Sequence, residues 1–327
     1  MDGIDSTRFS LRAARALELG ITPAELRSPL YRHPFHGVIT PAYVSVDPTS
    51  ARISDAVALM GPSNVLGGWA SLRTQGNTWF DGADRSGDDL DVLVHCRSGT
   101  QLRVRPGLRP SEGVLRPGEI KSLDGYDVTS MARAAYDEMR IAPGVREAVV
   151  VLDMATSSTS GVPHTTIDAV LAVMDTHRKT RGIVRVRRAL PLGDSRSASP
   201  WETRTRLVAQ LDAGIMRIRV NVPVFGAGGA LIGVADLFDP ETGLVVETDG
   251  SDHHDPVQHA SDNAREEKFE RAGAVVCRIS PADHQDRWSI VGRVVAAQRD
   301  AERSARRDWT LDQPDWWRTW PPARRWA

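Results

Sequence analysis

Two apolar runs on either side of a short polar turn constrain the fold of this chain more than any other feature. The first run, LIGVADLFD, covers residues 231–239, and the second, LVVET, covers 244–248, with PETG between them. Short runs of aliphatic and aromatic residues around a Gly- and Pro-containing turn predict an antiparallel hairpin. Each run nevertheless includes a carboxylate, Asp236 inside the first and Glu247 near the end of the second.

The pairing expected across this hairpin gathers its carboxylates. If PETG is the turn, Asp236 lies opposite Glu247 or one residue away from it. Opposite residues of an antiparallel pair share a face, and so do residues two apart, which adds Asp249. Carboxylates this close raise one another's pKa unless a cation joins them, and oxygen ligands suit Mg²⁺ or Mn²⁺. The hairpin therefore predicts a metal site, with the open alternative that the acids are solvated strand ends around a polar turn.

The region around the hairpin reads as one continuous α/β domain. Residues 191–199 are rich in Pro, Gly and Ser and predict a linker. After it come a helix, three strand-like runs, a helix ended by Gly273 and a short apolar strand. This α-β-β-β-α-β order, with a closing helix, predicts a domain over 200–305. Glu202, in the first helix, either completes a capping box with Ser199 or reaches the metal or its water.

The preceding residues predict two further regions. Residues 1–45 contain a helix, a turn, a second helix with a capping box begun by Thr22, and a strand pair, which is the outline of a winged helix. Residues 46–190 mix helical and strand-like runs, among them an expected hairpin of LDVLVHC and QLRVRP. With a tryptophan-rich tail over 306–327, the sequence predicts an α/β, multi-domain (α+β) protein.

Spaced residues of the C-terminal region resemble a nuclease family. The stretches SPWETR, ADLFD, LVVETDGSDHH and DNAREEKFERAGAVVCRIS carry the resemblance, between residues 199 and 280. They are similar to the nuclease-like domains related to very-short-patch-repair endonucleases, within the PD-(D/E)XK, or restriction-endonuclease-like, superfamily. The matching positions are Glu202, Asp236, Glu247, Asp249, Gly250, His253 or His254, Asp262, Arg265, Gly273 and Arg278.

This resemblance implies a restriction-endonuclease-like core that hydrolyses phosphodiester bonds of DNA with Mg²⁺ or Mn²⁺. Asp236 and Glu247 would hold the metal with the carbonyl of Thr248, and Asp249 stands where the superfamily has a charge-stabilising lysine. The candidate catalytic residues are therefore Glu202, Asp236, Glu247, Asp249, His253, His254 and Lys268, of which the histidines or Lys268 would replace that lysine. For the two histidines, a solvated loop or a zinc site are the alternatives.

The N-terminal region resembles a second family. RAARALELGITPAELRSPLYRHPFHGVITPA, VLGGWASLRTQG and DGYDVTSMARAAYDEM are similar to the antitoxins of the AbiEi type. This resemblance implies a winged helix followed by an α/β domain, and a second hypothesis for function: a DNA-binding regulator whose nuclease-like domain is inert. A toxin or a second copy of the chain is then the expected protein partner. The helix that would read DNA offers only Arg27 and Arg32, so a purely structural winged helix is the alternative.

Two other features concern nucleic acid. The stretch HRKTRGIVRVRR, residues 177–188, has six basic residues and no acid. It predicts phosphate contacts by Arg185, Arg187 and Arg188, together with Arg265 in the nuclease-like region, whereas a solvated helix face is the simpler alternative. The tail holds five of the nine tryptophans, which either stack on unpaired bases or cover apolar surface.

The composition and the N-terminal residues indicate the cellular compartment in which the chain is expected to work. The N-terminus MDGIDSTRFS lacks a basic start and an apolar stretch, so no signal peptide is expected, and the apolar runs are far short of a membrane span. Cys96 and Cys277 lie in apolar, strand-like runs and are expected to be reduced. We therefore expect a cytoplasmic protein without a membrane partner. A net charge of −1 excludes no class of partner, because basic and acidic regions cancel.

Overall fold

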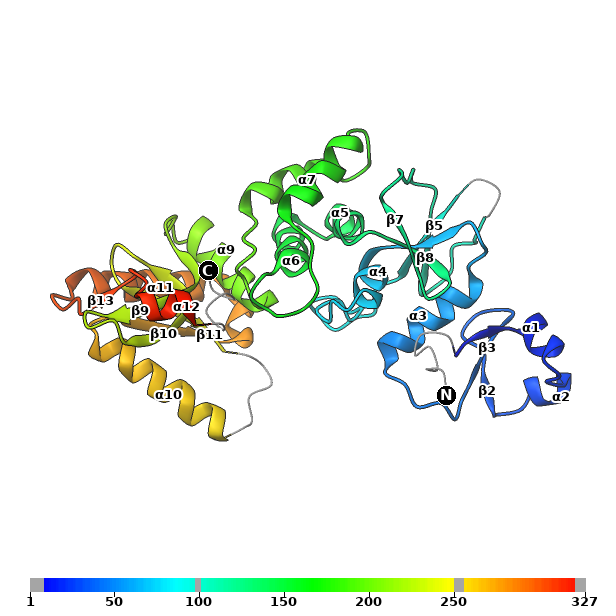
Figure 1. Ribbon diagram of the computed structural model, residues 1–327, viewed down its shortest axis with the longest axis horizontal. Coiled ribbons are helices and arrows are strands. Elements are labelled where there is room, and N and C mark those ends of the chain that lie inside the picture. The colour runs from blue at the N-terminus through cyan, green and yellow to red at the C-terminus, as the bar shows by residue number, and fades with distance from the viewer. Residues whose placement is uncertain (1–8, 98–100, 250–255, 321–327) are drawn as a thin grey trace. The chain divides into compact units, whose positions relative to one another are not determined.

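The computed structural model describes residues 9–97, 101–249 and 256–320, with the side chains of 256–263 excepted. The protein is α/β and forms two compact units, each made of two segments (Figure 1). Unit 1 comprises Met1–Ala142 and Asp168–Val186, and unit 2 comprises Pro143–Ile167 and Arg187–Ala327. Residues 143–167, which the sequence pattern placed in the middle region, thus group with the C-terminal one.

A small antiparallel sheet begins unit 1. Its strands, in the spatial order β1-β3-β2, are β1 (Leu11–Arg12), β2 (Tyr31–Arg32) and β3 (Val38–Pro41). The helices α1 (Ala13–Glu18) and α2 (Pro23–Leu26) come between β1 and β2 in the chain. The capping box of Thr22 and Glu25 is confirmed. Arg32 pairs with the buried Asp55 at 2.7 Å, which gives this arginine a structural role.

A mixed five-stranded sheet forms the centre of unit 1. Its strands, in the order β6-β5-β4-β8-β7, are β4 (Asn64–Leu66), β5 (Val92–Cys96), β6 (Leu108–Ser111), β7 (Ile120–Leu123) and β8 (Tyr126–Thr129). Its helices are α3 (Pro48–Leu59), α4 (Gly68–Thr74), α5 (Met131–Ile141) and α7 (Ile167–Thr176). The hairpin expected from LDVLVHC and QLRVRP is wrong. Residues 101–104 form no strand, and β5 pairs in parallel with β6 instead.

A network of buried ion pairs lies beside α5 in the interior of unit 1. The Arg133 side chain, only 1% exposed, donates from Nε to Asp137 Oδ2 at 2.8 Å and from Nη1 to Glu119 Oε2 at 2.7 Å. His95 Nε2 lies 2.9 Å from the same Asp137 oxygen, and Arg140 donates to Oδ1 at 2.7 Å. Burial alone raises the pKa of Asp137, but His95 and the two arginines outweigh it and hold this pKa well below its usual range.

A second five-stranded sheet forms the centre of unit 2. Its strands, in the order β12-β11-β10-β9-β13, are β9 (Arg219–Gly226), β10 (Leu231–Asp239), β11 (Leu244–Thr248), β12 (Val275–Ile279) and β13 (Trp309–Thr310). Its helices include α6 (Val145–Thr156), α9 (Pro200–Leu211), α10 (Pro256–Arg271), α11 (Arg287–Arg303) and α12 (Asp315–Thr319). The chain order α9-β9-β10-β11-α10-β12, closed by α11, confirms the predicted α-β-β-β-α-β order.

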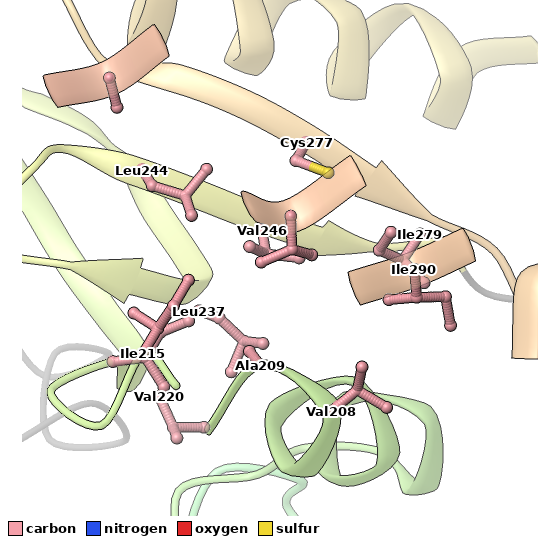
Figure 2. Packing of buried hydrophobic residues seen from close by; sticks show 13 residues of the cluster. Val208, Ala209, Ile215, Val220, Leu237, Leu244, Val246, Cys277, Ile279 and Ile290 are labelled. Atoms are coloured by element: carbon pink, nitrogen blue, oxygen red, sulfur yellow. The ribbon is translucent and has the colours of Figure 1, made fainter. Parts of the chain in front are cut away.

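Helices cover both faces of this sheet. On one face Val208 of α9 and Ile290 of α11 belong to one apolar core with Val246 of β11 (Figure 2). On the other face Phe269 of α10 packs with Val245, the neighbouring residue of the same strand. Because β11 is buried on both sides, its sequence reads as a continuous apolar run, and the carboxylate that follows inside the strand is the exception.

The tryptophan-rich end of the chain folds back on the sheet of unit 2. Strand β13 pairs antiparallel with β9, and Trp309 packs edge-to-face on Phe238, with ring centroids 4.9 Å apart. Trp317 is buried, whereas Trp316 and Trp320 keep exposed surface. For Trp309 and Trp317 the apolar-cover alternative is therefore confirmed.

Residues 191–199, expected to be a linker, are held against α6 and the loop that follows it. The Asp194 amide donates to Asp153 Oδ1 at 2.8 Å, and the Ser157 hydroxyl donates to the Ser197 carbonyl at 2.7 Å. These bonds are made to buried groups, since Asp153 and Ser157 are fully buried. The segment is therefore an integral part of unit 2.

Two expectations from the sequence concern membrane-spanning helices and the state of the two cysteines. Among the helices that the structure describes, none is both long and apolar enough to cross a membrane. Cys96 and Cys277 are both free thiols, and Cys277, on β12, is buried in the core that β12 shares with β11 and α11. Burial raises the pKa of the Cys277 thiol, as expected for a packing residue without a reactive role.

Candidate metal centre

One row of polar residues crosses the apolar sheet of unit 2. The pairing of the flanking residues places Asn221 of β9 opposite Asp236 of β10, and Asp236 opposite Glu247 of β11. The parallel pairing of β11 with β12 then places Arg278 beside Glu247. The first of the two registers predicted for the hairpin, with Asp236 directly opposite Glu247, is confirmed. Four strands thus contribute a polar residue to the same level of the sheet.

The backbone changes direction at this row. Asn221 has a φ of +46°, in the left-handed region that asparagine tolerates better than most residues. Val220, before it, packs in the core with α9 and α11, whereas Val222, after it, packs in the core with α10. Two residues that would share a face in a regular strand therefore point to opposite faces. The polar row therefore lies at the residue where the side chains of β9 switch from one face of the sheet to the other.

Asp236 lies in the middle of the row and is half-buried. Its Oδ2 accepts a hydrogen bond from the Thr248 amide at 2.8 Å, which ties the carboxylate to the end of β11. Its negative charge raises the pKa of two other carboxyl groups, Glu202 and Glu247. Asp236 is therefore the carboxylate common to a cluster of three, and Glu202 rather than Asp249 is the third member.

Glu247 is the most buried member of the cluster, with 5% of its surface exposed. Burial first, and then the charge of Asp236, raise its pKa to about 8, although Arg265, the backbone amide of Asp236 and Arg278 act in the opposite direction. Arg265 Nη2 donates to Glu247 Oε2 at 2.5 Å. Glu247 Oε1 is buried and has no hydrogen-bond partner. An unpaired buried carboxylate oxygen is costly, so this atom indicates a ligand.

Glu202 approaches the row from the first turn of α9. Its Oε2 accepts hydrogen bonds from Asn221 Nδ2 at 2.6 Å and from the Ala198 amide at 2.8 Å. Burial, and then the charge of Asp236, raise its pKa to about 7. The predicted capping box is only half formed: Ser199 accepts from the Glu202 amide, but the Glu202 carboxylate turns to Ala198 instead of the N-cap amide.

A shallow pocket lies between Glu247 and α10. Its lining consists of Glu247, Arg265, Glu266, Phe269 and Arg278. Arg278 pairs with Glu266 at 2.9 Å, and each of these side chains is about a third exposed, 30% and 31%. The pocket thus brings the buried carboxylate of Glu247 together with two guanidinium groups, and as the side chains lie here it is too narrow to hold a water molecule.

The residues present fit a divalent cation in part. Among the residues that the structure describes, no cluster of three or more His, Cys, Asp or Glu side chains forms a metal-binding group. Mg²⁺, however, is commonly held by one or two carboxylates, with waters and substrate phosphates as its other ligands. Asp236 and Glu247 meet that requirement, because they lie opposite each other and Glu247 Oε1 has no protein partner. A role for the Thr248 carbonyl stays a prediction.

No protein-family model matches the chain, and no curated protein matches it. The chemistry of the site therefore carries the inference about function. Among the predicted catalytic residues, Asp249 is exposed and Lys268 is exposed on α10, outside the pocket lining. The segment with His253 and His254 lies outside the described residues. The positively charged side chains that line the pocket are Arg265, which was predicted to contact nucleic acid, and Arg278.

The predicted phosphate-binding arginines of the basic run lie on and beside α8 (Ile183–Ala189). The Arg185 guanidinium donates to the Arg140 carbonyl and is half-buried, so it holds α8 to α5 within unit 1. Arg187 and Arg188 are exposed, as a phosphate-binding or a solvated face requires. Phosphate contacts by these three arginines stay a prediction, for which the Arg185 guanidinium is less available because it already donates to a backbone carbonyl.

Two residues of the site received no role from the sequence. Asn221 is the one amide in the apolar run RVNVPVF, and that break in pattern was available as a signal. Arg278 matched the family pattern, but only the parallel pairing of β11 with β12 shows that it lies beside Glu247. When two paired strands are separated by a helix, the residues near each strand do not indicate which strand is its partner.

The raised pKa values of Glu202 and Glu247 predict a dependence of stability on pH. A carboxyl with a native pKa above its ordinary value of 4.5 stabilises the native state below that value, and this stabilisation is lost as pH rises through about 7 to 8. We expect the metal-free protein to lose stability between about pH 5 and pH 8.5, by at most ~1.4 kcal/mol per pKa unit. Urea unfolding at both pH values measures this loss.

Glu247→Gln should flatten this pH dependence, because an amide cannot titrate. Glu241→Gln is the matched control, since Glu241 lies in the turn of the same hairpin and forms an exposed ion pair with Arg217. Glu138 and Asp153, whose pKa values burial also raises, contribute equally to all three proteins. The same pH dependence in the wild type and Glu247→Gln would show that Glu247 has an ordinary pKa.

Proposed function

We propose that the chain is a metal-dependent endonuclease that hydrolyses phosphodiester bonds of DNA in the cytoplasm, in repair or defence. The observation that carries the proposal is the Asp236–Glu247 pair, with the buried and unpartnered Glu247 Oε1 beside a pocket rimmed by arginines. A bound Mg²⁺ or Mn²⁺ would polarise the phosphate and lower the pKa of a water molecule. The two carboxylates are the residues that would hold it.

The remaining residues of the site have distinct roles in this proposal. Arg265 and Arg278, at the rim of the pocket, are placed to contact phosphate oxygens of the substrate. Glu202 has a pKa of about 7, close to the working pH, and is suited to accept a proton. Asn221 holds Glu202 by its Oε2 and so orients the carboxylate. No lysine is required, because two guanidinium groups supply the positive charge.

The second candidate is a DNA-binding regulator of the antitoxin type, with a toxin or a second copy as partner and an inert nuclease-like domain. One observation favours it. Arg265 already neutralises Glu247 at 2.5 Å, so this carboxylate has a stable partner without a metal. The two candidates share DNA as a ligand and differ in whether the bound DNA is cut.

A plasmid-nicking assay with the full chain separates them. We expect supercoiled DNA to be nicked with Mg²⁺ or Mn²⁺ and to stay intact in EDTA. Glu247→Gln should lower the rate by about 100-fold or more, because a lost metal ligand removes several kcal/mol of transition-state stabilisation. Binding of the same DNA is followed in parallel by a mobility-shift measurement.

Glu267→Gln is the matched control for this assay. Glu267 lies on α10, close to the site in sequence, and forms an exposed i,i+4 ion pair with Arg271. This variant should nick DNA like the wild type. Undiminished cleavage in EDTA, or full activity of Glu247→Gln, would exclude the proposed site, and DNA binding without any cleavage would favour the regulator.

A further inference from the structure

Glu247 of β11 and Arg265 of α10 form an ion pair between these two elements. Arg265 Nη2 reaches Glu247 Oε2 at 2.5 Å, and the Glu247 side chain is 7% exposed. A buried carboxylate needs a compensating cation, and without a metal the guanidinium of Arg265 supplies it. The positive charge of Arg265 accordingly lowers the pKa of Glu247, against burial and Asp236.

Arg265 is only partly enclosed by the protein. Its side chain is 38% exposed. Its stem passes over Gly233 of β10, where an added Cβ would come within 3.1 Å of Arg265 Cγ and 3.0 Å of the Phe269 ring. The glycine therefore provides the space in which the stem lies, while the anchoring of α10 depends on the buried Phe269.

A guanidinium and a divalent cation would compete for the negative charge of this carboxylate. Oε2 is engaged by Arg265, and Oε1 is the oxygen without a partner. A metal on Oε1 would lie within the width of one carboxylate from the guanidinium, and in a poorly hydrated site the two positive charges repel strongly. The neighbouring carboxylate Glu266 already pairs with Arg278 and offers no simple refuge on the protein.

We infer that Arg265 is an internal counter-cation of Glu247 that a divalent cation displaces, so that metal and guanidinium exclude each other at this carboxylate. The inference rests on the metal site of the proposed function and adds a regulation to it. In the metal-free protein Arg265 keeps the buried charge neutralised. When the metal binds, the guanidinium turns to the open side of the pocket, where a phosphate oxygen of a nucleic acid is its best acceptor.

Isothermal titration of Mg²⁺ into the full chain tests the exchange. At about pH 9 carboxyl groups are ionised even where burial disfavours the charge, so protons do not compete with the metal. We expect Arg265→Gln to bind Mg²⁺ about tenfold more tightly than the wild type, because the metal no longer displaces a cation. Arg265→Lys, which keeps the positive charge, should bind with an affinity close to that of the wild type.

Arg271→Gln is the matched control, because Arg271 lies on the same helix in an exposed ion pair with Glu267. Its affinity for Mg²⁺ should equal that of the wild type. If wild type binds Mg²⁺ and Arg265→Gln binds it equally or more weakly, the exchange is refuted and the metal site stands. If neither protein binds Mg²⁺, the metal site itself, and with it the proposed function, is refuted. A crystal structure with Mg²⁺ bound and the Arg265–Glu247 contact intact would also overturn the exchange.

Discussion

Replacing Asp236 by asparagine is expected to stabilise the metal-free protein and to abolish its response to Mg²⁺. The charge of Asp236 raises the pKa of both Glu202 and Glu247, so the three carboxylates oppose one another's ionisation. Asparagine keeps the shape, and its carbonyl can still accept from the Thr248 amide, which lies 2.8 Å from Asp236 Oδ2. At about pH 8 we expect a gain of roughly 1–3 kcal/mol from the relieved repulsion.

Urea unfolding of wild type and Asp236→Asn, with and without Mg²⁺, measures both effects. Asp239→Asn is the matched control, because Asp239 is buried on the same strand but accepts from Thr242 and the Glu241 amide, away from the cluster. The control should keep any stabilisation by Mg²⁺. A loss of several kcal/mol in Asp236→Asn would mean that its charge compensates a buried cation. A retained response to Mg²⁺ would remove Asp236 from the ligands.

Arg133→Met is expected to destabilise unit 1 by about 3–5 kcal/mol, because it removes one partner of a buried ionic network. The change leaves Asp137 and Glu119 with fewer cations, although both carboxylates are almost inaccessible to water. The methionine replaces much of the buried stem, so the effect reports on the charge more than on packing. Thermal and urea unfolding near neutral pH measure the loss.

Arg15→Met provides the contrast within the same unit, since Arg15 forms an exposed i,i+3 pair with Glu18 on α1. Exposed pairs contribute little, and no measurable change is expected there. The penalty of Arg133→Met should shrink in acid, because the pKa of Asp137 is held below its ordinary value of 3.8 and its favourable charge interactions are lost as pH falls below that range. A penalty that does not depend on pH, or a stable Arg133→Met, would contradict an electrostatic role.

The hairpin of unit 2 and its carboxylates were predictable because their signals are local. Two short apolar runs around a short turn predict which residues face each other, and the pairing of β10 with β11 is the predicted one. The α-β-β-β-α-β order followed from periodicity in the same way. Asp236 and Glu247 were visible because an acid inside an apolar run violates the pattern of a packed strand.

The parts that were not predictable depend on contacts between distant residues. Asn221 adopts a left-handed backbone conformation that reverses the alternation of side chains along β9. Residue propensities for strand formation do not specify the position of such a reversal. The proximity of Arg278 to Glu247 depends on a parallel pairing across α10, and the failed hairpin of unit 1 depends on the parallel pairing of β5 with β6. The sequence left two roles open for Glu202, a capping box or the metal site, and only the fold shows that its carboxylate turns to Asn221 of the polar row.

The segment between residues 143 and 186 has a consequence for how the protein is made. Residues 143–167 belong to unit 2 and residues 168–186 to unit 1, so the chain passes from unit 1 to unit 2, back, and over again. A ribosome that has reached residue 167 has released neither unit complete. Cleavage of the chain at a single peptide bond in this stretch would not yield two complete units. In unit 2 the edge strand β13, which pairs with β9, is formed by Trp309 and Thr310 near the end of the chain. Unit 1 is therefore completed only after the first segment of unit 2 has been made, and unit 2 is completed only near the end of synthesis.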